Sequence, residues 1–100
     1  MDLASFALSQ VQGEHGVDST TSALAMGNLA HALDRVGDYP KAKELLERAL
    51  SIDEREYGPE HVEVAATLGN LGCAFGNLGD YQKQKELLQR ALSILSLIHI

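Results

Sequence analysis

The sequence contains the same passage twice. Residues 37–52 read GDYPKAKELLERALSI and residues 79–94 read GDYQKQKELLQRALSI, so the two copies lie 42 positions apart. When residues 27–52 are aligned with residues 69–94, 17 of the 26 positions are identical. A period of this length is typical of repeat proteins, in which small structural units stack on their neighbours.

The tripeptide ALS indicates an earlier copy before these two. It begins at residues 7, 49 and 91, again 42 positions apart, so the N-terminal residues resemble the end of a preceding repeat. We therefore expect four segments along the chain. They are a remnant that comprises the second helix of a preceding repeat (residues 1–13), a first repeat (14–56), a second repeat (57–94) and a tail (95–100).

Each repeat predicts two helices, because apolar residues recur at steps of three and four. The predicted helices span residues 18–36, 40–55, 59–78 and 82–95. The apolar stripes of the first repeat are Ala25, Leu29, Ala32, Leu33 and Val36, then Ala42, Leu45, Leu46, Ala49, Leu50 and Ile52. On the second helices, Glu44 is expected to pair with Arg48 and Glu86 with Arg90, four residues further on.

Short polar signals separate these helices. Gly37 and Gly79 are expected to end the first helix of each repeat, because glycine accepts the left-handed conformation. Asp38 and Asp80 then cap the next helix, and Pro40 fits its first turn, where the missing N–H is harmless. Each repeat is therefore expected to form an antiparallel hairpin, which buries its stripe only by stacking on another.

The composition excludes several kinds of protein. The net charge of −6 argues against a nucleic-acid surface, because phosphate binding requires clustered lysine and arginine. The sequence has no run of 18 apolar residues, so no membrane association is expected. The single cysteine, Cys73, cannot form an internal disulfide, which favours a reducing, cytoplasmic location.

Both copies share a longer residue pattern. N-L-A-x-x-L-x-x-x-G-D-Y-x-x-A-x-x-x-L-x-x-A-L spans residues 28–50, and N-L-G-x-x-F-x-x-x-G-D-Y at residues 70–81 continues to L-x-x-A-L at residues 88–92. This pattern resembles the tetratricopeptide repeat, whose common form has 34 residues. The longer period, with Tyr-Gly-Pro-Glu-His at residues 57–61, is similar to the repeats of kinesin light chains and nephrocystin-like proteins. The resemblance covers residues 7–94 and implies an all-α fold, a right-handed superhelical α-solenoid fragment of stacked antiparallel helix pairs.

The resemblance also implies where a partner binds. In this family the first helix of each pair lines the concave surface, and an Asn at the position of Asn28 and Asn70 hydrogen-bonds the backbone of a bound peptide. Alternatively, these amides brace the neighbouring hairpin. The candidate peptide-binding residues on this face are Asn28, His31, Arg35, Asn70, Cys73 and Asn77. Because lysine and arginine are sparse among them, a clamp for the terminal carboxylate of a peptide is not expected.

These features predict a protein–protein interaction scaffold that binds a peptide or partner segment on its concave surface. The alternative is a structural or regulatory repeat arm of a larger multidomain signalling or motor-adaptor protein. The expected partner is a protein or peptide, not a nucleic acid or a membrane, and the exposed repeat ends favour self-association. Neither enzymatic activity nor a catalytic residue, cofactor or metal is expected.

Other motifs have simpler interpretations. GNLG at residues 69–72 and 76–79 lacks the Lys-Ser/Thr ending of a phosphate loop, and close helix packing explains its glycines better. Cys73 replaces His31 of the other repeat, so a catalytic thiol is not expected. The four histidines (His15, His31, His61 and His99) share no metal-ligand spacing. The acidic residues expected to form a solvated surface are Asp53, Glu54, Glu56, Glu60 and Glu63.

Two features depart from the repeat pattern. Gln84 occupies the position of Ala42, so we expect either a looser second hairpin or a side chain that reaches solvent. The last residues, LSLIHI, match one reading frame of a common sequencing adapter, so residues 95–100 are expected to be non-native and the reading frame truncated.

Overall fold

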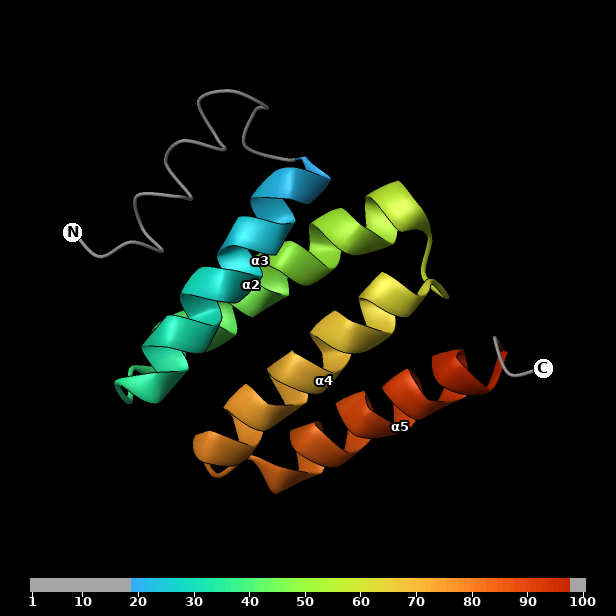
Figure 1. Ribbon diagram of the computed structural model, residues 1–100. Helices are drawn as coiled ribbons and strands as arrows, with labels where there is room; N and C mark the ends of the chain where they lie inside the picture. The colour runs from blue at the N-terminus through green and yellow to red at the C-terminus, as the bar shows by residue number, and fades with distance from the viewer. Residues whose placement is uncertain (1–18, 98–100) are drawn as a thin grey trace.

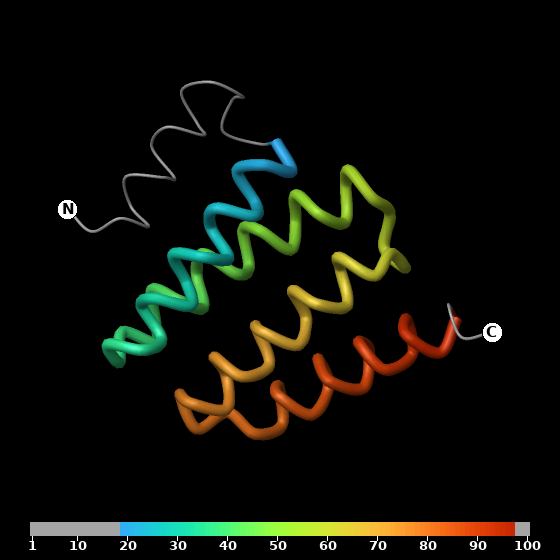
Figure 2. Tube along the Cα trace, in the orientation of Figure 1, coloured from blue at the N-terminus to red at the C-terminus, as the bar shows by residue number. Residues whose placement is uncertain are grey.

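The computed structural model describes residues 19–97, which form four helices. They are α2 (Thr20–Arg35), α3 (Tyr39–Tyr57), α4 (Val62–Asn77) and α5 (Tyr81–Leu97). Consecutive helices run antiparallel and pack on one another in chain order (Figure 1). The turns inside the two pairs lie at one end of the molecule, and the α3–α4 connection lies at the other (Figure 2). The prediction of an all-α repeat fold is therefore confirmed.

Three predicted segments extend beyond the described residues, including the first repeat, whose residues 14–18 lie outside them. The remnant of the preceding repeat, residues 1–13, lies outside them. Of the predicted tail, residues 95–97 continue α5 to its end, and residues 98–100 again lie outside the described part of the chain.

The turn from α2 to α3 uses the glycine that the sequence indicated. Gly37 has a φ of 88°, a conformation that costs glycine little. Its N–H donates to the carbonyl of Asp34 at 3.1 Å, and the N–H of Asp38 donates to the carbonyl of Leu33 at 2.8 Å. This pair of bonds is a Schellman motif, which satisfies carbonyls that the helix end leaves free. Gly79, with a φ of 87°, ends α4 in the same way.

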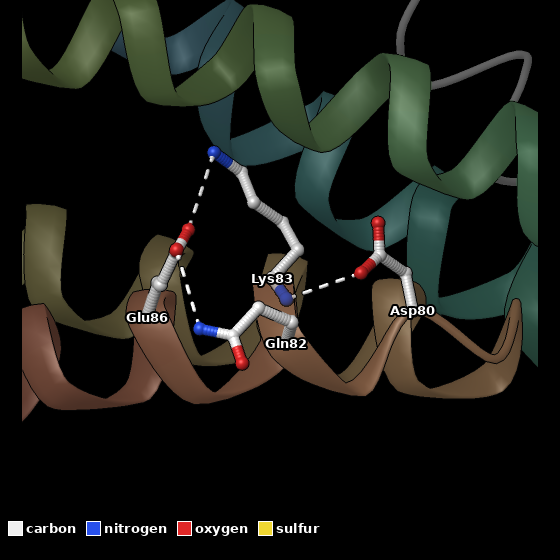
Figure 3. Close-up of polar contacts among 4 residues, drawn as sticks. All are labelled: Asp80, Gln82, Lys83 and Glu86. Atoms are coloured by element: carbon white, nitrogen blue, oxygen red, sulfur yellow. Dashed lines mark hydrogen bonds and ion pairs between the residues drawn. The ribbon is translucent and has the colours of Figure 1, made fainter.

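The predicted aspartate caps are also present. The Oδ1 atom of Asp38 accepts the backbone N–H of Lys41 at 3.4 Å. The equivalent bond in the second repeat joins Asp80 to the N–H of Lys83 at 3.1 Å (Figure 3). Pro40 lies in the first turn of α3, so the start of the second helix is fixed locally in both repeats.

The start of α4 differs from the prediction. The helix begins at Val62 instead of residue 59, because Pro59 lies in the connecting turn and His61 is the N-cap. The Nδ1 atom of His61 accepts the backbone N–H of Glu63 at 3.0 Å. The His61 ring also stacks on Tyr57, with 4.5 Å between the ring centroids. The imidazole of His61 therefore caps α4, a role that a short polar side chain usually has.

The core comprises two apolar clusters, of which the larger runs through both repeats. The larger cluster joins Ala30 of α2 and Leu46 of α3 to Leu68 of α4 and Leu87 of α5, together with their buried neighbours. The residues of the stripes predicted for the first repeat are all buried or half-buried except Val36, which is 78% exposed because it lies at the very end of α2. Stacking thus buries surface that neither hairpin covers alone.

Close packing explains only part of the glycine pattern on α4. A Cβ atom at Gly76 would lie 2.5 Å from Nε2 of Gln84, and one at Gly72 would lie 3.4 Å from Leu88. Gly69 has open space around it, so the packing explanation is wrong at that position. Gln84 is half-buried against α4, and its polar atoms are not left buried without a partner.

The ion pairs differ from those expected along each helix. Neither predicted pair forms within residues 19–97. Arg90 instead pairs with Glu54 of α3, and Glu86 lies 4.0 Å from Nζ of Lys83 and 3.5 Å from Nε2 of Gln82 (Figure 3). The contact between Arg90 and Glu54 joins the two repeats, so it adds to the stacking and not to a single helix.

Candidate functional site

A groove of about 480 Å³ lies between α2 and α4, and α3 forms its floor. The α2 wall includes Leu24, Gly27, Asn28 and His31, and the α4 wall includes Glu63, Ala66, Thr67 and Asn70. The floor comes from Leu46, Ala49 and Asp53. Since α2 and α4 both pack on α3, the groove exists only when the two repeats are stacked.

Four of the six candidate residues lie at this groove. Asn28, His31 and Asn70 line it, and Cys73 lines an adjoining hollow of about 170 Å³ that also includes His31 and Asn70. All four side chains are exposed. The structure thus places Asn28 and Asn70, which lie 42 positions apart in the sequence, on the two facing walls of the groove.

The two equivalent asparagines have free amides. Within the described part of the chain, neither Asn28 nor Asn70 forms a side-chain hydrogen bond. The structure therefore gives these two positions no bracing hydrogen bond to a neighbouring hairpin. Each amide offers N–H donors and a carbonyl acceptor at the groove.

The other two candidates lie elsewhere. Nδ2 of Asn77 donates to Oδ1 of Asp34 at 3.2 Å, which joins the C-terminal parts of α4 and α2. Asn77 thus performs the bracing role that was the alternative for the asparagines. Arg35 is exposed and lines neither hollow.

Asp53 is a groove residue that the sequence interpretation missed. It was expected on a solvated acidic surface, but its side chain is only 6% exposed. Oγ1 of Thr67 donates to its Oδ2 atom at 2.8 Å, from α4 to α3. Burial raises the pKa of Asp53 above its ordinary value of 3.8; the Thr67 hydrogen bond opposes this, nearby Glu63 adds to it, and His61 opposes it weakly.

The sequence contained a signal for this burial. Asp53 continues the buried stripe of Leu46 and Ala49 at steps of three and four. The position 42 residues before it, in the preceding copy, is Val11, which is apolar. Asp53 is therefore a charged residue at a position that is apolar in the preceding copy. The acidic prediction is confirmed at Glu56, Glu60 and Glu63, which are exposed, whereas Glu54 is half-buried and pairs with Arg90.

The described residues show no metal centre. Among residues 19–97, no group of three or more His, Cys, Asp or Glu side chains is placed to hold a metal ion. His15 and His99 lie outside that range. None of the helices in the same range is both long and apolar enough to cross a membrane.

The chain is similar to known repeat proteins. A family model described as "Tetratricopeptide repeat" matches residues 3–55 and 21–96. Among solved structures, the crystal structure of BtubC (BKLC) from P. vanneervenii superposes with a TM-score of 0.86 and 27% sequence identity. That match covers 95% of this chain and 38% of the BtubC chain, so the chain spans well under half of that protein's length. No curated protein sequence matches the chain.

Proposed function

Because the chain belongs to the tetratricopeptide repeat family, whose members generally mediate protein–protein interactions, we propose that its groove holds a peptide segment of a partner protein. The occupied surface is the groove between α2 and α4, floored by α3. The family is typically a non-enzymatic scaffold. The function proposed here is accordingly recognition by a rigid surface, without a chemical step.

The observation that carries this proposal is the pair of free amides at equivalent positions. Asn28 and Asn70 face one groove from opposite walls, and neither is engaged by another described side chain. A peptide backbone presents alternating N–H and C=O groups, which a side-chain amide matches with its own donor and acceptor. The repeat thus supplies two similar contacts along one extended segment.

The first test removes both amides. Random peptides displayed on phage are selected against the full chain, and the best binder is titrated against the Asn28→Ala/Asn70→Ala variant. We expect affinity to fall about ten-fold or more, because each lost hydrogen bond contributes about 1 kcal/mol. Both residues are exposed, and alanine is a good helix former, so circular dichroism of the variant is expected to match that of the wild type.

A matched pair of glycine variants tests the location. Gly27 lines the groove and Gly69, its counterpart in the second repeat, does not, while both have open space around them. Gly27→Gln places a side chain in the groove and is expected to weaken binding, and Gly69→Gln is expected to leave binding unchanged. Equal effects of the two substitutions, or unchanged affinity in the double-asparagine variant, would reject the groove as the binding surface.

A second candidate is a repeat arm of a larger signalling or motor-adaptor protein, similar to the repeats of kinesin light chains. The exposed apolar face of α5, described below, and the small share of BtubC that the chain covers favour it. In that case the segments 14–56 and 57–94 are two units of a longer array in the cytoplasm. Sequencing the full transcript tests this candidate, because a transcript that encodes no further repeat and no further domain would reject it.

A further inference from the structure

The charged residues that line the groove are all acidic. Asp53 and Glu63 line the main groove, and Asp34 lines the adjoining hollow. No lysine or arginine lines either space. The first lysine or arginine in the sequence is Arg35, so residues 1–34 contain neither.

Asp53 is buried at the groove floor without a positive partner. One carboxylate oxygen accepts the Thr67 hydroxyl, but none of the ion pairs among residues 19–97 includes Asp53. The two arginines that form ion pairs within residues 19–97 do so with other carboxylates: Arg90 with Glu54 and Arg55 with Glu56. A buried carboxylate with a single neutral hydrogen bond is costly, and a cation within reach would relieve that cost.

We propose that the groove selects peptides carrying a lysine or arginine side chain, whose charged end meets Asp53. This inference rests on the proposed peptide-binding function and names the chemistry of its ligand. Leu24, Leu46 and Ala66 give the groove apolar surface for the aliphatic stem of such a side chain. Its ammonium or guanidinium group then forms a charge-assisted hydrogen bond with Asp53, with Glu63 adding negative potential from the α4 wall.

A purely structural role for Asp53 makes a different prediction. In that case the residue matters only because it accepts the Thr67 hydroxyl and so fixes how α4 sits on α3. Asp53→Asn separates the two roles, because its amide oxygen still accepts that hydrogen bond while the charge is lost. Glu63→Gln provides a second variant, at an exposed side chain of the α4 wall. Glu56→Gln changes the net charge equally and lies outside the groove lining, so it is the matched control.

The experiment selects phage-displayed random peptides against the full chain and against its Asp53→Asn variant. We expect wild-type binders to share a lysine or arginine at one position, and binders of the variant to lose that preference. The best peptide and its analogue with glutamine at that position are then titrated against all four proteins. Removing the basic side chain is expected to weaken binding to the wild type about ten-fold or more, and to have little effect on binding to Asp53→Asn.

Three outcomes would contradict the inference, and they differ in what they leave standing. Binders without a shared basic residue that still depend on Asn28 and Asn70 overturn the charge preference and leave the peptide groove intact. Basic binders that Glu56→Gln weakens as much as Asp53→Asn show that net charge alone attracts them, which also overturns it. The absence of any peptide that depends on Asn28 and Asn70 rejects the proposed function and this inference together.

Discussion

Gly76 and Gln84 form a pair of complementary size where α4 meets α5. The amide of Gln84 lies so close to position 76 that a Cβ atom there would be only 2.5 Å from its Nε2 atom. In the first repeat the equivalent positions hold Asp34 and Ala42, so the large and small residues exchange places. The second hairpin therefore accommodates a glutamine at a normally small position because the facing residue has no side chain.

This pairing predicts energetic coupling between the two residues. In a Gln84→Ala background, Gly76→Ala is expected to raise the free energy of unfolding by about 1 kcal/mol, the difference in helix propensity. In the native background the gain is expected to be smaller, because the glutamine amide must first move away. Urea unfolding of the four variants measures both gains, and equal gains would show that the two residues do not interact.

Asp53 predicts a specific pH dependence of stability. Burial raises the pKa of this carboxyl above 3.8, so the folded chain binds its proton more tightly than the unfolded chain does. The contribution of Asp53 to stability therefore falls as the pH rises from 3.8 through the raised pKa. Thr67, Glu63 and His61 are the polar groups that modify this value.

Asp53→Asn removes that dependence while it keeps the acceptor for Thr67. We expect the variant to be more stable than the wild type at pH 7, and the difference to shrink as the pH is lowered towards 4. Chemical denaturation at several pH values measures the difference, with exposed Glu56→Gln as the control. A variant that is less stable than the wild type by the same margin at every pH would show that the charge itself is favourable in the fold.

At the scale of the helix, the two repeats differ in how far the second helix of each is buried. Leu46 of α3 is buried and Leu50 is half-buried against the core, whereas their counterparts Leu88 and Leu92 on α5 are 39% and 66% exposed. No helix follows α5 within residues 19–97. The outer face of α5 thus presents the kind of surface that α3 buries, and it is an apolar patch of the sort that promotes association.

This exposed face predicts self-association of the chain through α5. We expect the Leu92→Gln variant to associate at least about ten-fold more weakly, because burying an exposed leucine contributes about 1.5–3 kcal/mol. Sedimentation equilibrium measures the change, with Val36→Gln, which is exposed at the end of α2, as the control. A wild-type chain that remains monomeric as its concentration rises would contradict this expectation.

The helices were largely predictable because their boundaries depend on local chemistry. Gly37 and Asp38 act through bonds to residues at most five positions away, so the sequence alone indicates where α2 ends and α3 begins. The predicted start of α4 was wrong because Pro59 suggested a helix start and histidine is an unusual N-cap. The partner of Arg90 was not predictable, since Glu54 lies on another helix and only the stacking brings the two together.

At the scale of the whole molecule, the repeat predicted the stack but not the contents of its groove. The groove walls followed from the family resemblance, which indicated the polar residues of each first helix. The floor depends on how α3 sits between α2 and α4, so Asp53 was assigned to solvent although it is buried beneath both walls. Its apolar counterpart in the preceding copy, Val11, shows that comparison with that copy carried this information.

The central claim is that the stacked repeats bind a peptide between α2 and α4, and amide chemical-shift mapping tests it most directly. The peptide selected against the full chain is titrated into dilute ¹⁵N-labelled protein, and each backbone amide is followed. The account predicts that the largest shifts occur at Gly27, Asn28, Thr67 and Asn70, on the two groove walls. Shifts concentrated on the outer face of α5, with those four amides unchanged, would contradict it.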